Sequence, residues 1–400
     1  MIVTGQFNDS LPPILDGVAV TARNYAYWLN RNHAPSFAFG PRVPGYKNHE
    51  DFEIRYRSLR TRVVDPYRLG LPAVDRGFGR SIESIPFDLV HAHCPFISGW
   101  YALILARKRN IPLVTTFHTK YRDDFENIIR MSVMVNQVIH FMVRFYDHAD
   151  EVWVPNEAII ETLREYGFKG PVQYVPNGSD IEPENGARKE KLAESGREFL
   201  GVTGDRPVLI YVGQHRKAKN LRFLVDSLAV ARQNGSEFDV RFIGDGPDRA
   251  ELQEQVAKLG LEERVRFMGA VHERERLRAI YAAAGLLVFP SLYDNASLVT
   301  REAAGFEVPT LFCEGATTAA GIQNGLDGFL AKDTPEEYGG LITTILRDSE
   351  MLRTAGIGAR KTLYKSWEDI VDEVYDRYGE VVERYKWQQL RGLRPNRPAA

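Results

Sequence analysis

The sequence predicts an α/β protein of two domains, each built on a parallel sheet. Short apolar runs typical of buried strands alternate with longer helical segments along almost the whole chain. The 400 residues exceed the size of a typical single hydrophobic core, which favours two domains. The formal net charge of −2 gives no reason to expect a nucleic-acid partner.

Cysteine content and hydropathy bear on the cellular compartment. The two cysteines, Cys94 and Cys313, lie far apart in sequence, which is no disulfide framework and is typical of a reducing cytosol. The N-terminus lacks the pattern of a signal peptide, and no apolar run has the length of a membrane span. We therefore expect a cytoplasmic protein, with a disordered Arg- and Pro-rich tail at residues 391–400.

The first domain is expected over residues 1–178. It begins with a short strand at Ile2–Gly5, a loop that ends at Gly17, and a helix over Val18–Asn30. A glycine at a junction between strand and helix allows the backbone to approach a phosphate or a sugar, but many such glycines only make turns. Gly17 alone is therefore a weak signal.

Two further strands of this domain are expected at residues 88–93 and 111–117. The first ends in His93, and His118 directly follows the second. Active-site groups of open α/β sheets gather at the carboxyl ends of the strands. His91 and His93 share one face of their strand and a cysteine follows, so a metal site is one interpretation. Because no further ligand follows at a telling spacing, buried and hydrogen-bonded histidines are the plainer interpretation.

The segment Tyr121–Asp147 is more apolar than a solvated helix requires. Arg122, Arg130 and Arg144 are interspersed in it, and Lys120 precedes it. One interpretation is a core helix with a loop. The other is an interfacial helix on a bilayer, with its cations at anionic headgroups. The core helix is the plainer interpretation.

The second domain is expected over residues 179–365, with the polar segment Ile181–Glu194 as the linker. Its first strand, at residues 207–213, leads into a loop with three cations, Arg216, Lys217 and Lys219, and then into a helix. The unpaired amides of a helix N-terminus carry partial positive charge, so cations in the same loop indicate a phosphate site. The alternative is a solvated basic loop.

The stretch Phe289–Glu302 combines the end of a buried strand, a polar loop and a helix N-terminus. The helix is expected to begin at Leu298 with Ser297 as its N-cap. Asp294 and Glu302 flank the loop with seven residues between them. A nucleotide sugar would give both features a partner, a diphosphate for the amides and hydroxyls for the carboxylates. The alternative is an ordinary strand, loop and helix with solvated acids.

This stretch resembles the signature of the family 4 retaining glycosyltransferases. The family pattern is Phe-Pro-Ser, an acid, seven residues and Glu-Ala before a Gly and a Pro, and its first acid is usually Glu where this chain has Asp294. Further motifs follow the family's order along nearly the whole chain. They are Phe117-His118-Thr119, Lys219-Asn220 and Phe242-Ile-Gly-Asp-Gly-Pro247.

The resemblance implies the GT-B fold, with two Rossmann-like domains facing across a cleft. The helices at residues 366–390 would pack back on the first domain, and the second domain would bind the donor. The implied reaction is transfer of a hexose from a nucleotide diphosphate sugar, UDP-glucose as the first guess, with retention of configuration. Because the donor loop has no Asp-x-Asp motif, neither a metal nor another cofactor is expected.

The resemblance also assigns roles to matching positions. Lys219 would hold the diphosphate, Glu302 the ribose and Asp294 the hexose hydroxyls, while His118 would lie against the hexose. The expected catalytic residues are His118, Asp294 and Lys219. The expected donor-binding residues are Gly17, Gln214, Arg216, Lys219, Gly244, Val271, Asn295, Ala296, Ser297, Leu298 and Glu302.

Two departures from the family pattern keep other functional classes open. Gln214 stands where the family has an arginine, whose charge Arg216 or Lys217 would have to replace, and Asp294 is the second departure. The alternatives are a non-catalytic nucleotide-sugar-binding protein and a phosphorylase or epimerase on the same fold.

The acceptor is open as well. The resemblance is nearest to bacterial enzymes that glucosylate diacylglycerol, so a lipid acceptor at the cytoplasmic face of an anionic membrane is expected. A soluble saccharide acceptor is the alternative.

Overall fold

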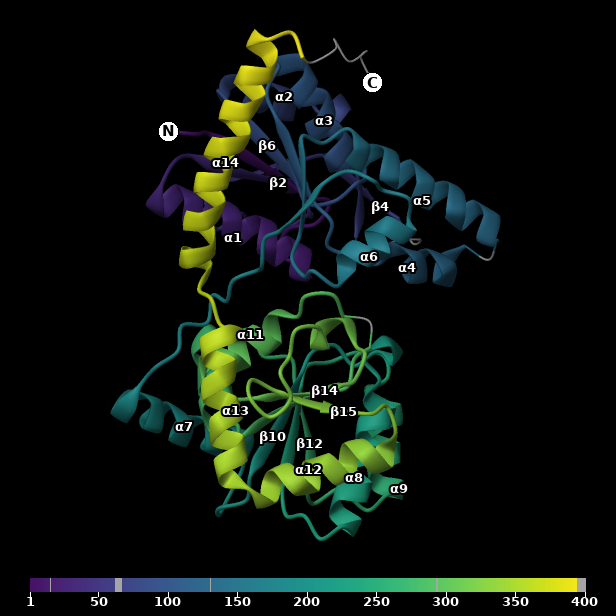
Figure 1. Ribbon diagram of the computed structural model, residues 1–400, viewed down its shortest axis with the longest axis vertical. Helices are drawn as coiled ribbons and strands as arrows, with labels where there is room; N and C mark the ends of the chain where they lie inside the picture. The colour runs from purple at the N-terminus through teal and green to yellow at the C-terminus, as the bar shows by residue number, and fades with distance from the viewer. Residues whose placement is uncertain (15, 62–66, 130, 293, 394–400) are drawn as a thin grey trace. The chain divides into compact units, whose positions relative to one another are not determined.

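In the computed structural model the chain forms two compact units, and each is described by itself (Figure 1). Unit 1 comprises Met1–Asn177 with Trp367–Ala400, and unit 2 comprises Gly178–Ser366. The structure describes residues 1–14, 16–61, 67–129, 131–292 and 294–393. From residue 394 onward, the tail expected to be disordered lies outside the described residues.

Unit 1 is built on a seven-stranded parallel sheet with the order β3-β2-β1-β6-β7-β8-β9, and β4 and β5 form a separate antiparallel pair. Its strands are β1 (Thr4–Phe7), β2 (Ser36–Pro41), β3 (Glu53–Tyr56), β4 (Ser58–Arg60), β5 (Arg68–Gly70), β6 (Leu89–Ala92), β7 (Leu113–Thr116), β8 (Glu151–Val154) and β9 (Val172–Tyr174). Its helices are α1 (Gly17–Asn32), η1 (Pro72–Val74), α2 (Arg76–Ser84), α3 (Ile97–Arg109), α4 (Tyr121–Ile128), α5 (Ser132–Asp147), α6 (Ile159–Glu165) and α14 (Trp367–Leu390).

Unit 2 is built on a six-stranded parallel sheet with the order β12-β11-β10-β13-β14-β15. Its strands are β10 (Val208–Val212), β11 (Asp239–Ile243), β12 (Val265–Gly269), β13 (Leu286–Phe289), β14 (Thr310–Cys313) and β15 (Phe329–Ala331). Its helices are α7 (Gly186–Leu200), η2 (Lys217–Lys219), α8 (Leu221–Gln233), α9 (Arg249–Lys258), α10 (Arg274–Ala283), α11 (Leu298–Gly305), η3 (Thr317–Ala319), α12 (Pro335–Arg347) and α13 (Ser349–Thr362).

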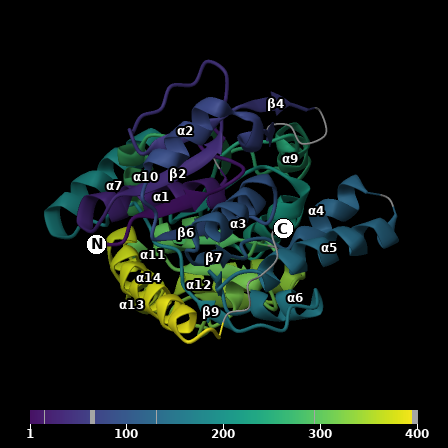
Figure 2. The same cartoon turned by 90° about the horizontal axis from the view of Figure 1, so that it is seen from above.

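Most inner strands of both sheets are buried along their whole length. Every residue of β1, β6, β7 and β8 in unit 1, and of β11, β13 and β14 in unit 2, is buried. Helices cover both faces of each sheet, as Figures 1 and 2 show. Parallel strands covered on both faces need continuous rather than alternating apolar runs, and this explains why the sequence predicted these strands.

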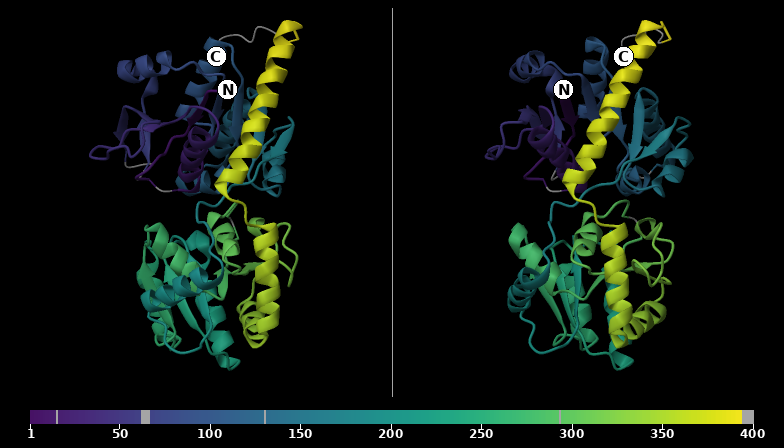
Figure 3. Two further views of the ribbon diagram at one scale, coloured as in Figure 1. Left: turned by 90° about the vertical axis from the view of Figure 1, so that its left-hand side faces the viewer. Right: turned by 60° about the vertical axis from the view of Figure 1, so that its left-hand side comes forward.

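The C-terminal helix α14 belongs to unit 1 and runs along it (Figure 3). Its Tyr378 ring stacks on Trp153 of β8, with the ring centroids 5.4 Å apart. The buried Glu151 carboxylate of β8 accepts hydrogen bonds from Arg384 at 2.5 Å and Arg377 at 3.5 Å. Ring stacking and ion pairing therefore both fix α14 to the sheet.

The expected linker Ile181–Glu194 was wrong in its extent. Helix α7 begins at Gly186 within that segment and packs against α10. Leu192 and Phe199 lie on its apolar side, and Leu200 is fully buried at its end. Apolar residues spaced seven and eight positions apart, as Leu192, Phe199 and Leu200 are, lie on one face of a helix. The many charged residues between them hid this helical pattern in the sequence.

The apolar segment after β7 forms two helices, α4 and α5, that lie side by side. The sequence predicted one core helix with a loop in this segment, whereas the structure has two helices, and only one face of α5 lies in the core. One face of α5 packs into the unit 1 core through Val135, Ile139 and Met142, whereas Phe141 is 51% exposed. In the part of the chain that the structure describes, no helix is long and apolar enough to cross a membrane.

Candidate active site

The strand order of unit 2 defines where a ligand site is expected. Strand β10 lies in the middle of the sheet, with β11 and β12 on one side and β13, β14 and β15 on the other. The chain therefore leaves β10 in one direction and leaves β13 in the other. Ligands of open α/β sheets bind outside the carboxyl ends of the strands at such a switch point.

The loop after β10 places its cations at this switch point. Arg216 and Lys217 are exposed, whereas the side chain of Lys219 is 25% exposed. Asn220 has a left-handed backbone, with φ of 56°, and its side chain does not cap the following helix α8. The loop thus ends in a helix N-terminus whose own N-cap residue supplies no side-chain acceptor.

The loop after β13 meets the loop after β10. The Ser291 hydroxyl donates to the Ala218 carbonyl at 3.4 Å, and the Asn220 amide donates to the Pro290 carbonyl at 3.4 Å. Between these contacts, the ammonium of Lys219 pairs with Oδ1 of Asp294. This ion pair joins residues of the two loops that lie 75 positions apart in sequence.

Only one of the two carboxylate oxygens of Asp294 has a partner among the described residues. Its Oδ2 is buried and has no hydrogen-bond partner among the described residues. A buried oxygen without a partner is costly, so a hydroxyl donor from a ligand would stabilise this carboxylate.

Ser297 occupies the N-cap position of α11, but the expected capping bond is absent. Its side chain accepts no hydrogen bond from the first turn of this helix. The Thr300 hydroxyl instead donates to the Ser297 carbonyl at 2.8 Å. The prediction that α11 begins at Leu298 with Ser297 as its N-cap residue is confirmed, although the Ser297 side chain makes no capping hydrogen bond. The amides that a capping side chain would bind keep their capacity for an anion.

Glu302 lies on the second turn of α11 and is half-buried. Burial raises the pKa of its carboxyl to about 7, and the charge of Asp180 acts in the same direction. The Tyr281 hydroxyl, which donates to Oε2 at 2.6 Å, and the charge of Arg274 oppose this shift of the pKa. Glu302 can therefore be neutral or ionised near neutral pH.

Gly244 has a packing role that the sequence did not reveal. Its φ is +137°, and a Cβ there would lie 1.9 Å from the carbonyl oxygen of Gly213. The loops after β10 and β11 are further joined by the amide of His215, which donates to the Asp245 carbonyl at 2.9 Å. Gly244 therefore lets the cationic loop rest on its neighbour.

The remaining expected donor residues of unit 2 lie around the same strand ends. Gln214 is exposed, and its carbonyl accepts a hydrogen bond from the Tyr211 hydroxyl at 3.0 Å. Val271 follows β12 and is half-buried. The residues of the β13 loop and the first residue of α11 are also half-buried, and they are Asn295, Ala296, Ser297 and Leu298.

In unit 1, His118 follows β7 and is buried beside His93. Burial lowers the pKa of His118 to about 3 and holds the pKa of His91 and His93 well below the usual range, so all three rings are neutral. His91 bonds Tyr378 and Thr116, each at 2.7 Å. No group of histidine, cysteine or acidic side chains in the described part of the chain is arranged to hold a metal ion.

Gly17 begins α1, where a Cβ would meet nothing within 4 Å. The preceding Asp16 caps the helix by accepting from the amide of Ala19 at 2.7 Å. Nothing in the fold of unit 1 therefore requires glycine at this position.

The helix N-terminus at the switch point of unit 1 is already occupied by a carboxylate. Asp9, which follows β1, accepts from the amide of Ser98 in the first turn of α3 at 3.1 Å. The Cys94 thiol donates to the other carboxylate oxygen at 2.9 Å. The first turn of α3 therefore already has an acidic partner, whereas the N-cap side chain of α11 in unit 2 makes no capping hydrogen bond.

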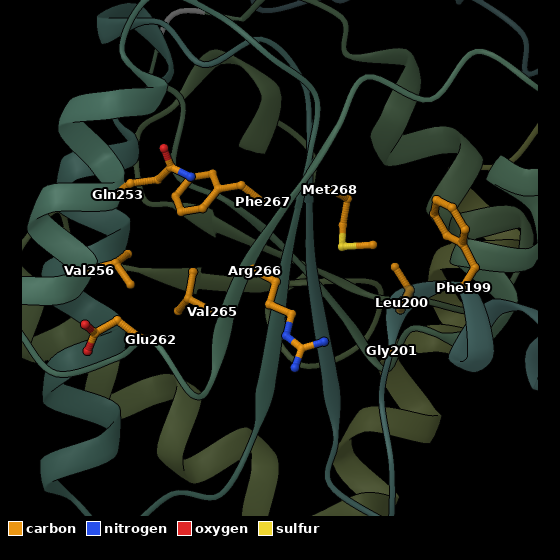
Figure 4. Close-up of a pocket in the computed structure, with 10 residues that line it drawn as sticks. All are labelled: Phe199, Leu200, Gly201, Gln253, Val256, Glu262, Val265, Arg266, Phe267 and Met268. Atoms are coloured by element: carbon orange, nitrogen blue, oxygen red, sulfur yellow. The ribbon is translucent and has the colours of Figure 1, made fainter.

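A separate cavity of about 460 Å³ lies along the edge strand β12 (Figure 4). Gln253 and Val256 of α9 line one side of it, and Phe199 and Leu200 at the end of α7 line the other. None of its lining residues belongs to the loops after β10 or β13. This cavity is distinct from the switch point.

Known families match both halves of the chain. The model for Glycosyltransferase Family 4 matches residues 15–183, and the model for Glycosyl transferases group 1 matches residues 194–362. The chain belongs to glycosyltransferase family 4. Its motifs lie where the family resemblance placed them, at the strand ends of two parallel sheets.

Similar proteins are known in sequence and in structure. This family 4 glycosyltransferase is 25% identical over 316 residues to the α-monoglucosyldiacylglycerol synthase of Streptococcus pneumoniae, across 77% of this chain and 70% of that enzyme. It resembles the sucrose-phosphate synthase of Thermosynechococcus elongatus, with a TM-score of 0.77, 20% identity and coverage of 96% and 100% of the two chains.

A second structural neighbour was solved with a sugar nucleotide. HepE of Anabaena, in complex with UDP-glucose, has a TM-score of 0.73 and 18% identity, and the alignment covers 95% of this chain and 99% of HepE. These likenesses confirm the GT-B fold that the sequence predicted.

Two residues of this glycosyltransferase that bear on the site were missed in the sequence. Tyr281 of α10 bonds Glu302, and Gln6 of β1 bonds His93. A buried polar residue at the carboxyl end of an otherwise apolar strand could have singled out Gln6. No local signal pointed to Tyr281, because its partner lies 21 positions away on another helix.

Proposed function

We propose that this glycosyltransferase moves glucose from UDP-glucose to a membrane lipid or lipid-linked sugar with retention of the anomeric configuration. The observation that carries the proposal is the meeting of Lys219 and Asp294 at the switch point of unit 2. One loop brings a cation for a diphosphate, and the other brings a carboxylate oxygen that needs a hydroxyl donor. A nucleotide diphosphate sugar has both groups.

Each donor contact that the family resemblance implies has a candidate residue in this arrangement. Lys219 and the N-terminal amides of α11 would bind the diphosphate, and Asp294 would accept from a hexose hydroxyl. Glu302 would accept from the ribose hydroxyls. A charged amine and a helix N-terminus together supply the positive charge that a metal ion supplies in other enzymes, so we propose that transfer needs no divalent metal.

The leaving phosphate would take the proton of the acceptor hydroxyl, because no separate base is required for such a retaining transfer. His118 would lie against the hexose. UDP-glucose as the donor is supported by the name of the pneumococcal relative, which forms a glucosyl lipid, and by the UDP-glucose bound in HepE.

A lipid acceptor is supported by the outer face of α5. Met131 and Val133 are 61% and 63% exposed, and Met134 and Phe141 are exposed to about half. The Phe141 ring stacks on Trp100 of α3, with the centroids 4.9 Å apart, which extends the apolar surface towards the exposed Ile104. Exposed apolar side chains in such a group are typical of a surface that enters a membrane or binds a partner.

The charges around α5 favour an anionic membrane. Residues 131–146 contain no acidic residue, and Arg144 is exposed. Arg122, which was expected to meet headgroups, instead bonds Asn136 at 2.9 Å and pairs with Glu126 at 3.6 Å. Arg130 lies outside the described residues. We therefore place the membrane contact on the apolar residues of α5, at the cytoplasmic face of the membrane.

The decisive experiment combines UDP-glucose with vesicles that contain diacylglycerol and anionic lipid. The expected products are UDP and a glucosyl lipid in equal amounts, with the α-linkage of the donor. Release of UDP and free glucose at the same rate with and without lipid would contradict a lipid acceptor. Binding of UDP-glucose without any turnover would favour a non-catalytic binding protein.

The membrane surface can be tested separately by co-sedimentation. The double variant Met134→Ser with Phe141→Ser should bind anionic vesicles at least about ten-fold more weakly, because two apolar side chains no longer enter the bilayer. Ile357→Ser on α13 is a matched control, since Ile357 is 46% exposed but belongs to unit 2. Equal binding by all three proteins would contradict a role for α5.

A further inference from the structure

The strands β4 and β5 form a two-stranded ribbon that is separate from the main sheet of unit 1. Leu59 lies directly opposite Leu69 in this antiparallel pair, so the two side chains are on the same face. They are 54% and 42% exposed, although the solvent-facing side of an antiparallel ribbon is normally polar. The ribbon therefore presents apolar side chains where water would favour polar ones.

The other face of the ribbon attaches it to unit 1. Gly70 is buried on that face, and a Cβ at this position would lie 2.6 Å from the Tyr56 ring. Ser58 lies opposite Gly70, and its hydroxyl accepts from the Arg68 guanidinium at 2.7 Å. Because side chains alternate between the two faces of a strand, this attachment keeps the two leucines on the outer face.

Exposed apolar side chains continue on the neighbouring elements. Strand β5 and the short helix η1 both pack against α3. Val74 of η1 is 67% exposed, and Ile104 of α3 is exposed to about half. One turn before Ile104, Trp100 stacks on the exposed Phe141 of α5. Apolar side chains thus extend from the ribbon over α3 to α5, which is typical of an interaction surface and not of isolated exposed residues.

The ribbon and its neighbours carry a strong positive charge. Residues 55–80 contain seven arginines and two aspartates. Asp75 is buried as the N-cap of α2, and Asp65 lies outside the described residues. The exposed arginines of this segment are Arg57, Arg60, Arg76 and Arg80. Apolar side chains among cations are complementary to an anionic lipid surface, which offers acyl chains to the leucines and phosphates to the guanidinium groups.

Unit 1 carries the opposite charge on its other side. Figures 1 and 2 both place α14 on the side of the unit away from β4 and α5. An anionic membrane would attract the ribbon side and repel the α14 side, and it would thereby orient the unit. The exposed acidic residues of α14 are Glu368, Asp369, Asp372, Glu373, Asp376, Glu380 and Glu383.

We propose that the β4–β5 ribbon and η1 form a second membrane contact of unit 1, in which Leu59 and Leu69 enter the bilayer and the nearby arginines bind anionic headgroups. The ribbon thus supplies the preference for anionic lipid that the apolar face of α5 lacks. It follows directly after β3, at the edge of the sheet where the parallel strands have their carboxyl ends. A lipid acceptor would then reach this edge without leaving the membrane, and this last step rests on the proposed function.

A fluorescent label on the ribbon tests the contact directly. Both native cysteines are buried, so Leu59→Cys gives the full chain one accessible thiol for an environment-sensitive dye. Vesicles of phosphatidylglycerol and phosphatidylcholine should shift the emission to shorter wavelength, and vesicles of phosphatidylcholine alone should shift it far less. Leu326→Cys is the matched control, since Leu326 is 56% exposed in unit 2 and its label should not respond. Unchanged emission at position 59 with the anionic vesicles would overturn the proposal.

Two double variants separate the apolar part of the contact from its charged part in co-sedimentation. Leu59→Ser with Leu69→Ser should bind the anionic vesicles at least about ten-fold more weakly, because two apolar side chains no longer enter the bilayer. Arg57→Gln with Arg76→Gln should bind them about ten- to thirty-fold more weakly and should bind phosphatidylcholine vesicles as the wild type does. Wild-type binding of anionic vesicles by both variants would overturn the proposal.

The controls exclude general effects of charge and of folding. Arg188→Gln with Lys191→Gln removes two positive charges from exposed positions of α7 in unit 2 and should bind as the wild type does. Melting curves show whether each variant is folded. If the wild type forms a dimer that Leu59→Ser with Leu69→Ser abolishes, while vesicle binding stays the same, the ribbon contacts a second copy of the chain and the lipid contact is wrong.

The last measurement separates this inference from the proposed function, because co-sedimentation needs no UDP-glucose. Leu59→Ser with Leu69→Ser should need about ten-fold more anionic vesicle lipid for half-maximal glucose transfer. If vesicle binding falls in this variant but the wild type transfers no glucose, the proposed transfer is wrong and the membrane contact stands. If glucose is transferred and the variant binds and turns over as the wild type does, the membrane contact is wrong and the transfer stands.

Discussion

Replacing Asp294 by Asn should make UDP bind more tightly and glucose transfer slower. In this structure Asp294 pairs with Lys219, the cation that we assign to the diphosphate. A diphosphate therefore has to compete with a carboxylate for the same ammonium group. The Asn variant keeps the shape of the side chain but removes this competition, and it also removes a negative charge beside the diphosphate.

The size of the effect follows from the exposure of the pair. The two side chains are 25% and 22% exposed, which places the pair between a surface ion pair and a buried one. Surface pairs contribute up to about 1 kcal/mol and charge-assisted hydrogen bonds about 1.5–3 kcal/mol, so we take about 1–2 kcal/mol for this pair. Tightening of UDP binding by about five- to thirty-fold follows. The value of kcat should fall, because Asn cannot match the carboxylate as an acceptor for the hexose hydroxyl.

Calorimetry with UDP at constant ionic strength measures the first effect, and release of UDP from UDP-glucose measures the second. Asp205→Asn is a matched control, since it makes the same change of charge at an exposed position of unit 2 outside the two loops. Equal or weaker UDP binding by Asp294→Asn would refute the competition between carboxylate and diphosphate. Unchanged kcat would refute the contact with the hexose.

Four further predictions concern the same site. Lys219→Ala should weaken binding of UDP-glucose about ten- to hundred-fold, the value of a charge-assisted hydrogen bond, and equal binding in a folded variant would exclude Lys219 from the diphosphate site. Glu302, whose pKa burial raises to about 7, should bind the ribose as a carboxylate, so the affinity for UDP-glucose should rise from pH 6 to pH 8 in the wild type and stay level in Glu302→Gln. Because the raised pKa favours the protonated form in the fold, Glu302 contributes stability that is present below pH 4.5 and lost as the pH rises through about 7, and melting curves of the wild type and the Gln variant should diverge in that range. Transfer should keep its rate in excess chelator, and loss of activity that Mg²⁺ or Mn²⁺ restores would contradict the metal-independent proposal.

The sequence predicted the apolar strands that carry the site more readily than the charged strand β3. Strands such as β7 and β13 are continuous apolar runs because helices cover both faces of the sheet. Strand β3 has the sequence Glu-Ile-Arg-Tyr, and its charges concealed it. Its buried Glu53 pairs with Arg23 and Arg55, each at 3.0 Å, so the partner that permits burial lies partly outside the strand. A pattern within one segment cannot show such a partner.

The spacing of the motifs identified the candidate site residues, but it could not show their ion pairs or their pKa values. Asp294 and Glu302 stand out because a carboxylate at each end of a loop beside a helix N-terminus is unusual. That Asp294 pairs with Lys219 depends on β10 and β13 being neighbours in the sheet, which no local pattern shows. That the pKa of Glu302 is raised to about 7 depends on its burial by the fold, which the hydrogen bond from Tyr281 of another helix offsets only in part. These properties come from packing and needed the structure.

The two units share one strand order but differ in what they present at its switch point. In unit 1, the carboxylate of Asp9 fills the N-terminus of α3, and the strand ends nearby carry three neutral histidines. In unit 2, the Ser297 side chain does not cap α11, and the neighbouring loop carries Lys219. The histidines of unit 1 are buried and uncharged, whereas the loop of unit 2 carries a partly exposed cation beside an uncapped helix N-terminus. Under the proposed function, this difference in capping favours unit 2 over unit 1 for the diphosphate, because an anion is stabilised by free helix amides and by a nearby cation.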